Sequence, residues 1–374
     1  MQRPDFIAVN EPLLDGNEKK YLAECIETGW ISSEGPFVER FERAFCDRVG
    51  RKWGVAVCNG TAALDAAIEA LGIGPGDEVI LPAFTIISCI GQIIRCGARP
   101  VLVDSDARTW NMDVSQIEAK ITPRTKAIMV VHTYGLPVDM DPVLAIAKRH
   151  GLAVIEDAAE AHGQAYRGRP CGSFGDISTF SFYPNKLVTT GEGGMIVTND
   201  DGLAATCSSL RNLCFQPHRR FVHERLGWNL RMTNLQAALG VAQLERIDEF
   251  ATRKRAMGKR YTQLLSGVAG LQLPQAKTEY ADNIYWVYGL MLAETIDFGA
   301  AEAMKKLAAV GVGCRPFFCP MNQQPVLLER GLFAGESYPV AERMYRKGFY
   351  IPSGLALTED QMTRVAEAVG SILK

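Results

Sequence analysis

The sequence has no long hydrophobic run, no closely paired cysteines and no excess of charge of either sign. No segment approaches the roughly 20 apolar residues that a membrane-spanning helix needs. The polar N-terminal stretch MQRPDFIAVNEPLLDGNE also lacks the apolar region of an export signal. The ten cysteines are scattered without a C-x-x-C pair, which favours reduced, packed thiols over disulfides. We therefore expect a cytoplasmic protein that has no membrane partner.

The charge and the motifs of the sequence argue against several further classes of protein. The chain carries 42 acidic and 40 basic residues, a net charge of −2, so no basic excess predicts a nucleic-acid partner. Its five histidines form no metal-ligand pattern, and no G-x-S-x-G nucleophile motif is present. At 374 residues, 47% of them hydrophobic, the chain is long enough for two domains with a substantial core.

Short β-branched runs alternate with helical stretches from residue 55 onward. EVILPA, KAIMVVH and LAVIEDAAE are examples of the runs, and this rhythm predicts an α/β fold with a mostly parallel sheet covered by helices on both faces. The later runs DISTFSF and GGMIVTND alternate in polarity, which indicates antiparallel pairing between them. A long amphipathic segment, 229–265, predicts a helix that leaves this domain. We therefore expect a large domain over 1–250 and a small α+β domain over 251–374.

One lysine, Lys186, lies between an apolar run and a Thr/Gly cluster in STFSFYPNKLVTTGEGG. Burial lowers the pKa of a lysine and favours the neutral amine, which is a nucleophile. The alternative is an ordinary surface lysine in a loop after a strand.

Acidic residues end another apolar run 29 positions earlier. Glu156 and Asp157 close LAVIED, and ligands of open α/β sheets gather at the carboxyl ends of strands. An aspartate placed opposite a buried lysine is what a protonated pyridine ring nitrogen requires. Taken alone, Asp157 fits an N-cap for the AAEAHG segment better than it fits a cofactor contact.

A third pattern, CNGTAALDAAIEALG, has the form of an anion cradle. A strand leads through a glycine turn into a helix whose free N–H groups and dipole favour a phosphate. Gly60 permits close approach and Thr61 offers a hydroxyl, although Thr61 is also a candidate N-cap. Ser181, five residues before Lys186, could supply a further hydroxyl or only bond to strand backbone.

These segments, in this order, resemble the DegT/DnrJ/EryC1/StrS family of sugar aminotransferases. The resemblance extends from LDGNEKKYLAECIETGWISSEGPFVERFERAF through CNGTAAL, IEDAAEAHG, FSFYPNKLVTTGEGG and GWNLRMTNLQAALGVAQLE to CRPFF. It implies the aspartate-aminotransferase fold (fold type I) with a seven-stranded sheet and pyridoxal 5′-phosphate as cofactor. Within the family, ETGWISSEG, EDAAEAHG and TTGEGGMIVTND look most like members that use glutamate to aminate C4 of GDP-4-keto-6-deoxymannose.

The resemblance also implies roles for individual residues. It makes Lys186 the lysine that binds the cofactor covalently, Asp157 the partner of the ring nitrogen, and Glu160 a neighbour of the phenolic oxygen. It places three residues at the cofactor phosphate: Gly60, Thr61 and Ser181. The segment WNLRMTN resembles one that reaches into a neighbouring subunit, which implies a homodimer with Asn229 at the partner's cofactor phosphate and Arg231 nearby.

Several positions depart from the family pattern, all where the sugar is expected. PAFTIIS has Ile86 in place of the usual ring-stacking aromatic residue, so stacking by that residue is lost. Phe84, two positions back on the same strand face, is a candidate substrate contact. CPMN, with Cys319 and Asn322, replaces a histidine-rich segment. Candidate contacts to substrate diphosphate or carboxylate groups are basic side chains: Arg231, Arg315, His218, Arg219 and Arg220.

The resemblance thus implies an aminotransferase that moves the amino group of L-glutamate to a nucleotide-linked 4-keto-6-deoxyhexose. Other nucleotide-linked or free keto sugars remain alternative acceptors. A sugar dehydratase of the same fold would carry histidine in place of Lys186. A non-catalytic homologue that binds the cofactor is a further alternative, and no metal ion is expected.

Overall fold

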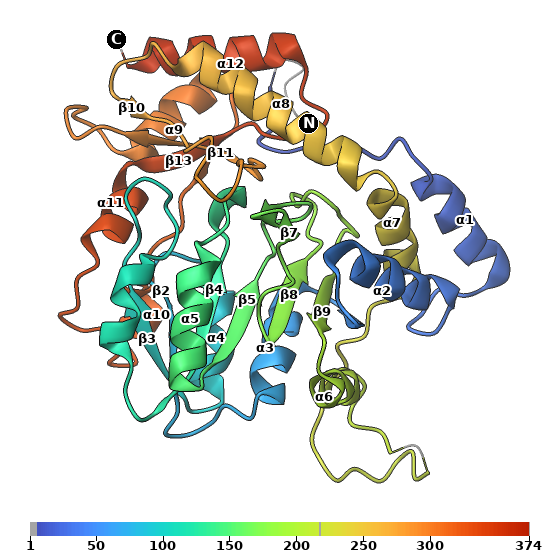
Figure 1. Ribbon diagram of the computed structural model, residues 1–374. Helices are drawn as coiled ribbons and strands as arrows, with labels where there is room; N and C mark the ends of the chain where they lie inside the picture. Colours follow the sequence, from blue (N-terminus) through green and yellow to red (C-terminus); the bar gives the residue numbers. More distant parts are fainter. Residues whose placement is uncertain (1–5, 217, 374) are drawn as a thin grey trace.

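The structure, a computed structural model, describes residues 6–216 and 218–373. Its main feature is a seven-stranded sheet with strand order β1-β9-β8-β5-β4-β2-β3 (Figure 1). β9 runs opposite to the other six strands, since β1 and β8 both pair with it antiparallel. The mostly parallel sheet and the antiparallel pairing of the two late runs are therefore confirmed. The strands are β1 (Trp53–Val57), β2 (Glu78–Pro82), β3 (Arg99–Val103), β4 (Thr125–Val131), β5 (Ala153–Asp157), β8 (Ile177–Ser181) and β9 (Gly194–Thr198).

Helices cover both faces of this sheet because its strands are apolar on both sides. Ala127 and Met129 of β4 belong to the core cluster that includes α3 and α4, whereas Ile128 and Val130 belong to the cluster that includes α5. The aromatic side chains of α2 pack with α7 over β8 and β9. The helices of this part are α1 (Glu18–Thr28), α2 (Pro36–Val49), α3 (Gly60–Ala70), α4 (Ser88–Arg95), α5 (Met140–His150), α6 (Asp201–Arg211) and α7 (Asn234–Leu244).

A second, antiparallel sheet of four strands lies above the first in Figure 1, with order β10-β11-β13-β12. Its strands are β10 (Leu271–Gln272), β11 (Tyr288–Leu292), β12 (Arg315–Pro316) and β13 (Gly348–Ile351). The helices of this part are α8 (Ile247–Leu265), α9 (Ala300–Ala309), α10 (Pro325–Leu328), α11 (Pro339–Lys347) and α12 (Glu359–Ile372), and the short strands β6 (Ala165–Tyr166) and β7 (Arg169–Pro170) form a separate hairpin.

The single long helix predicted over 229–265 is instead two helices. α7 begins at a capping box formed by Thr233 and Gln236, and Arg246 leaves helical geometry before α8 starts. The chain breaks there because the halves bury their apolar faces in different places: α7 packs with α1 and α2, and α8 packs with α12. The prediction of one continuous helix was therefore wrong.

The predicted domain boundary near residue 250 falls inside α8. Ile7, from the other end of the chain, packs in the same core cluster as the C-terminal sheet and pairs with Val312. Each of the ten cysteines is a free thiol. Among residues 6–216 and 218–373, no helix combines the length and apolar character needed to cross a membrane.

Candidate active site

Two neighbouring parallel strands bring the predicted chemical residues to one edge of the large sheet. β5 ends at Asp157, and β8, which pairs with it, ends at Ser181. Glu160 follows β5 by three residues, and Lys186 follows β8 by five. Since the carboxyl ends of parallel strands meet at one edge, these side chains converge although the sequence separates them.

The amine of Lys186 lies inside this site rather than in solvent. Only 11% of its side-chain surface is exposed, and Nζ lies 3.7 Å from Oε1 of Glu160. The ring of Trp286 lies on the same amine, with its centroid 3.8 Å from Nζ. Burial lowers the pKa of Lys186, while the charges of Glu160 and Asp157 act in the opposite direction. The ordinary surface lysine considered above is therefore excluded.

Both carboxyl groups of the site are buried and oriented by backbone amides. Oε2 of Glu160 accepts a hydrogen bond from the backbone N–H of Tyr134 at 2.8 Å, and burial raises the pKa of Glu160 to about 7. Oδ1 of Asp157 accepts one from the N–H of Ala159 at 3.0 Å. The thiol of Cys89 donates to Oδ2 of Asp157 at 3.3 Å. Burial also raises the pKa of Asp157, and Lys186 opposes that shift.

Asp157 is not a helix N-cap. The residues after it form turns rather than a helix, and its side chain bonds to the amide two residues on. The N-cap reading of the sequence is thus wrong for this position, which leaves the carboxylate turned into the buried site.

The start of α3, where the sequence predicts an anion cradle, lies against the end of β8. A Cβ built on Gly60 would lie 2.7 Å from Cβ of Ser181, so only glycine fits between these two elements. The helix is capped by Asn59, whose Oδ1 accepts from Ala62, and not by Thr61. The hydroxyl of Thr61 instead lies 2.8 Å from that of Ser88, the first residue of α4.

Phe84 does not take the part expected of it. Its ring is fully buried, with ring centroids 5.9 Å from Tyr134, 5.9 Å from Phe317 and 5.6 Å from Phe318. It therefore presents no surface to a bound molecule, and the predicted substrate contact at Phe84 is wrong. Ile86, by contrast, is 43% exposed.

Arg315 lies in β12, the strand at one edge of the small sheet. It pairs through its backbone with Tyr350. Burial, followed by the charge of Glu160, raises the pKa of Tyr350 to about 12, and Arg315 lowers it. The ring centroid of Tyr350 lies 6.4 Å from that of Trp286, the ring that contacts Lys186, so Arg315 pairs with a residue close to the site.

The segment that contains Asn229 and Arg231 joins the end of β1. The carbonyl of Leu230 accepts from the N–H of Cys58 at 2.7 Å, two residues before Gly60. Nε of Arg231 donates to Oδ1 of Asn229 at 3.0 Å. The single chain thus brings this segment near the start of α3.

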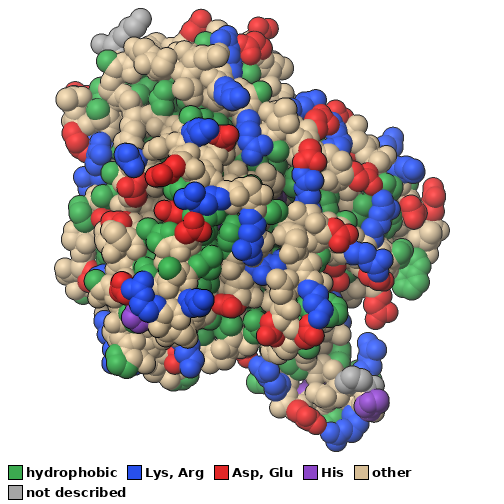
Figure 2. Space-filling view, viewed as in Figure 1, with side chains coloured by type: hydrophobic (Ala, Val, Ile, Leu, Met, Phe, Trp, Pro, Cys, Tyr) green, Lys and Arg blue, Asp and Glu red, His purple; other side chains and the backbone are tan. Residues whose placement is uncertain are grey.

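The remaining candidates lie away from Lys186 within one chain. His218, Arg219 and Arg220 belong to the segment between α6 and α7, which projects below α6 in Figure 1. Arg219 pairs there with Glu224 at 2.8 Å. Basic and histidine side chains gather on this projection in Figure 2, and Phe221 is exposed on it.

Sequence reasoning missed five groups around the site. They come from other parts of the chain and carry no local motif: Ser88, Cys89, Tyr134, Trp286 and Tyr350.

Comparisons with known proteins identify the family of the chain. The family model described as the DegT/DnrJ/EryC1/StrS aminotransferase family matches residues 12–370. The GDP-perosamine synthase of Caulobacter vibrioides is 47% identical over 368 residues, 98% of each chain. That of Escherichia coli O157:H7 is 41% identical over 97% of this chain and 98% of its own. The crystal structure of the aminotransferase TlmJ from Streptoalloteichus hindustanus matches with a TM-score of 0.91 and 30% identity over 98% of both chains. The chain belongs to the DegT/DnrJ/EryC1/StrS aminotransferase family.

Proposed function

We propose that this protein is a pyridoxal-phosphate-dependent sugar aminotransferase whose cofactor is bound covalently by Lys186. The observation that carries the proposal is the buried amine of Lys186, 3.7 Å from one buried carboxylate and beside a second. Burial favours the neutral form of such a lysine, and the neutral amine is the form that attacks an aldehyde.

The residues present fit this cofactor. Gly60 leaves space between α3 and β8 that a Cβ would fill, and the free N–H groups of the helix start there favour a phosphate. Nearby buried polar atoms have no partner within the described residues, as expected where a polar group binds: Oγ1 of Thr179, Oδ1 of Asn185 and the hydroxyl of Tyr134.

Each residue then has a role in holding the group. Asp157 would bind the protonated ring nitrogen and Glu160 the phenolic oxygen, while the phosphate would be held by the α3 start and nearby hydroxyls: Gly60, Thr61, Ser181 and Ser88. Pyridoxal phosphate, when bound, supplies an electron sink next to the reacting carbon.

The chain's own chemistry is proton transfer. Lys186, once free of the cofactor, would act as a general base: its Nζ would take the proton from the α-carbon of the amino donor, hold it as the ammonium, and then donate it to the carbon that was the aldehyde carbon of the cofactor. The backbone amides of Tyr134 and Ala159 hold the two carboxylates in place while this happens. Burial lowers the pKa of Lys186 and so favours the neutral form that acts as a base, while the charges of Glu160 and Asp157 act in the opposite direction.

For the substrates we propose L-glutamate as donor and GDP-4-keto-6-deoxy-D-mannose as acceptor, with GDP-perosamine as product. The support is that the curated relatives at 47% and 41% identity, matched over nearly their whole length, are named GDP-perosamine synthases. We also propose a cytoplasmic homodimer with shared active sites. Arg315 and Arg231 are candidate contacts to the nucleotide sugar, and His218 and Arg219 could reach only a partner's site.

The test is Lys186→Ala. We expect complete loss of turnover with the fold retained, because this amine supports no core, and retention of the fold is checked by circular dichroism. In the unchanged protein, borohydride reduction followed by peptide mapping should find a pyridoxyl adduct on Lys186. Absence of that adduct, or normal catalysis by Lys186→Ala, contradicts the proposal.

The acceptor is tested separately with a panel of nucleotide-linked and free keto sugars. Mass spectrometry should show exchange of a ketone for an amine with the GDP-linked substrate. If only another keto sugar reacts, the protein is still an aminotransferase, but the proposed acceptor is wrong. If Lys186 carries the adduct but neither glutamate nor any sugar reacts, the protein is a non-catalytic homologue.

A further inference from the structure

Among the residues that the structure describes, Glu160 and Trp286 contact the amine of Lys186, and of these two side chains only Glu160 is ionisable. Glu160 approaches Nζ to 3.7 Å, and the ring centroid of Trp286 lies 3.8 Å from the same atom. Trp286 comes from the chain just before β11, about 100 residues away, and is buried. An aromatic face attracts an ammonium ion more strongly than a neutral amine. This contact therefore favours the protonated form of Lys186, with Nζ over the face of the ring.

Trp286 is fixed on two sides. Its indole Nε1 donates to the backbone carbonyl of Asn185 at 2.8 Å, one residue before Lys186. Its own carbonyl accepts from Nζ of Lys254 at 2.7 Å. The side chain of Trp286 is therefore joined to the loop of Lys186, and its backbone is joined to α8.

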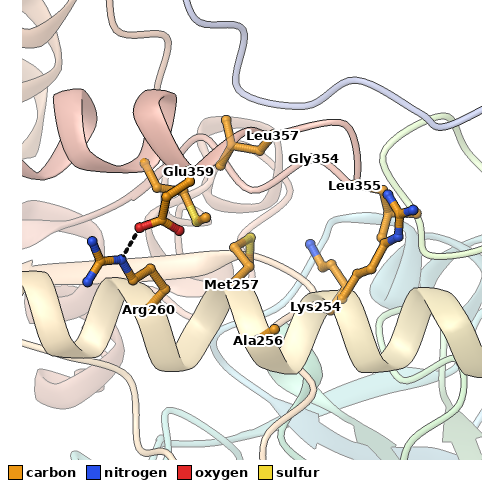
Figure 3. A pocket seen from close by; sticks show the side chains of 10 residues that line it. Lys254, Ala256, Met257, Arg260, Gly354, Leu355, Leu357 and Glu359 are labelled. Atoms are coloured by element: carbon orange, nitrogen blue, oxygen red, sulfur yellow. Dashed lines mark hydrogen bonds and ion pairs between the residues drawn. The ribbon is translucent and has the colours of Figure 1, made fainter.

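Lys254 is an unusual residue to find at such a place. It is only 3% exposed, and burial lowers its pKa to about 7. Figure 3 shows its side chain rising from α8 toward the segment that carries Leu355. Its amine also donates to the carbonyl of Ser353, so both acceptors described for it are backbone carbonyls. A buried amine that donates to two backbone carbonyls fixes these backbone segments relative to one another.

We propose that Trp286 is a positioning residue for Lys186: its ring holds the free amine beside Glu160, and Lys254 fixes that ring through the Trp286 carbonyl. The inference rests on the proposed function, in which Lys186 is free of the cofactor for part of each cycle. A long side chain without such a contact would sample orientations that point away from the reacting carbon.

The experiment measures the amine directly, in the full-length protein freed of cofactor. Competitive labelling with acetic anhydride across pH, followed by mass spectrometry of the peptide that contains Lys186, gives the midpoint at which this amine loses its proton. The other groups that face Lys186 are unchanged in every variant used: Glu160, Asp157, Cys89 and His162.

Trp286→Leu should move the Lys186 midpoint down by roughly 0.5–1 pH unit, because the ammonium loses its aromatic contact. Trp286→Phe keeps an aromatic face and should fall between this variant and the unchanged protein. An unchanged midpoint in a folded Trp286→Leu protein overturns the role of the ring. If that variant does not fold, fluorinated tryptophan at position 286 weakens the attraction without changing the shape, and an unchanged midpoint there overturns it equally.

Lys254 is tested in the same assay. Lys254→Met should move the midpoint in the same direction by a smaller amount, and Lys254→Arg, which restores donors, should recover part of the shift. A folded Lys254→Met protein with the unchanged midpoint overturns the part of the proposal that concerns Lys254. The labelling experiment uses no cofactor, so an unchanged midpoint contradicts only the role of Trp286 or Lys254. The proposed function is contradicted by a different result, the absence of a pyridoxyl adduct on Lys186.

Discussion

Lys186, Glu160 and Asp157 are three ionisable side chains buried in one site, and burial acts on them in opposite directions. It lowers the pKa of the lysine and raises the pKa of both carboxyl groups, while attraction between the unlike charges counteracts each shift. Their protonation is therefore coupled, so a change at one carboxyl must appear in the titration of the amine.

Glu160→Gln should lower the pKa of Lys186, because it removes the nearest negative charge from a buried ammonium. The labelling midpoint of Lys186 would move to lower pH. Glu118→Gln, which changes a carboxylate paired with Arg149 on the surface, is the matched control and should leave the midpoint unchanged. A rise of the midpoint in Glu160→Gln would contradict the assignment of Glu160 as the partner of Lys186.

At the scale of elements, the cradle depends on how closely α3 approaches β8. Gly60→Ala should push these elements apart, because the new Cβ would lie 2.7 Å from Cβ of Ser181. We expect a loss of about 1–3 kcal/mol in the free energy of unfolding, as for other overpacked sites. Binding of pyridoxal phosphate should weaken at least tenfold, measured by absorbance titration.

The second substitution Ser181→Gly tests the cause. It removes the two nearest atoms of the clash, so Gly60→Ala combined with Ser181→Gly should be less destabilised than the sum of the single changes. Strict additivity in urea unfolding would mean that contact with Ser181 is not why position 60 is glycine.

The turn between β7 and β8 is fixed by a buried carboxylate, Glu156. It accepts hydrogen bonds from the N–H groups of Gly172 and Gly175 and from the hydroxyl of Ser178, and it pairs with His132. Burial alone would raise its pKa, but His132 and these hydrogen bonds lower it to about 2. The ionised carboxylate of Glu156, surrounded by hydrogen-bond donors, thus holds the turn between β7 and β8 in place.

This shift has a defined pH dependence. The pKa of Glu156 is lower in the folded chain than the ordinary 4.5, so the folded state binds fewer protons between these values. The stability it contributes is complete above pH 4.5 and is lost as pH falls toward about 2. Glu156→Gln should therefore cost about 2–4 kcal/mol at pH 7 in urea unfolding. The difference should narrow below pH 4.5, and a constant difference would be inconsistent with an ionised Glu156.

At the scale of the whole molecule, two arrangements are distinguished: Asn229 contacts the cofactor site of its own chain, or it contacts that of a partner chain. The structure brings its segment to the end of β1 in the same chain, whereas the family resemblance implies the partner's site. We expect Lys186→Ala and Asn229→Asp to be inactive alone, since one lacks the base and the other repels the phosphate.

Co-expression of these two variants distinguishes the arrangements. With shared sites, a hybrid dimer contains one site with both residues intact, so about one quarter of normal activity should return for random pairing. If Asn229 serves its own chain, no activity returns. Light scattering on the co-expressed protein establishes the dimer independently.

The sequence by itself determined the elements of the large sheet and the identities of Lys186, Asp157, Gly60 and Thr61 as candidates. Strands and glycine turns can be recognised from the local sequence. Because ligands bind at the carboxyl ends of strands in open α/β sheets, the residues that follow these strands could be predicted to form a site. The same signals did not predict the break between α7 and α8 at Arg246. The local sequence has a continuous apolar pattern there and does not indicate that its two halves pack against different helices.

Only the tertiary structure decided which side chains surround the amine. Trp286 and Lys254 come from segments 100 and 68 residues after Lys186, and their contacts arise from packing of α8 and β11 against the loop after β8. Phe84 shows the reverse case, since the sequence made it a candidate substrate contact and an aromatic cluster buries it. Periodicity states which face of an element is apolar, whereas the packing of distant elements determines what covers it.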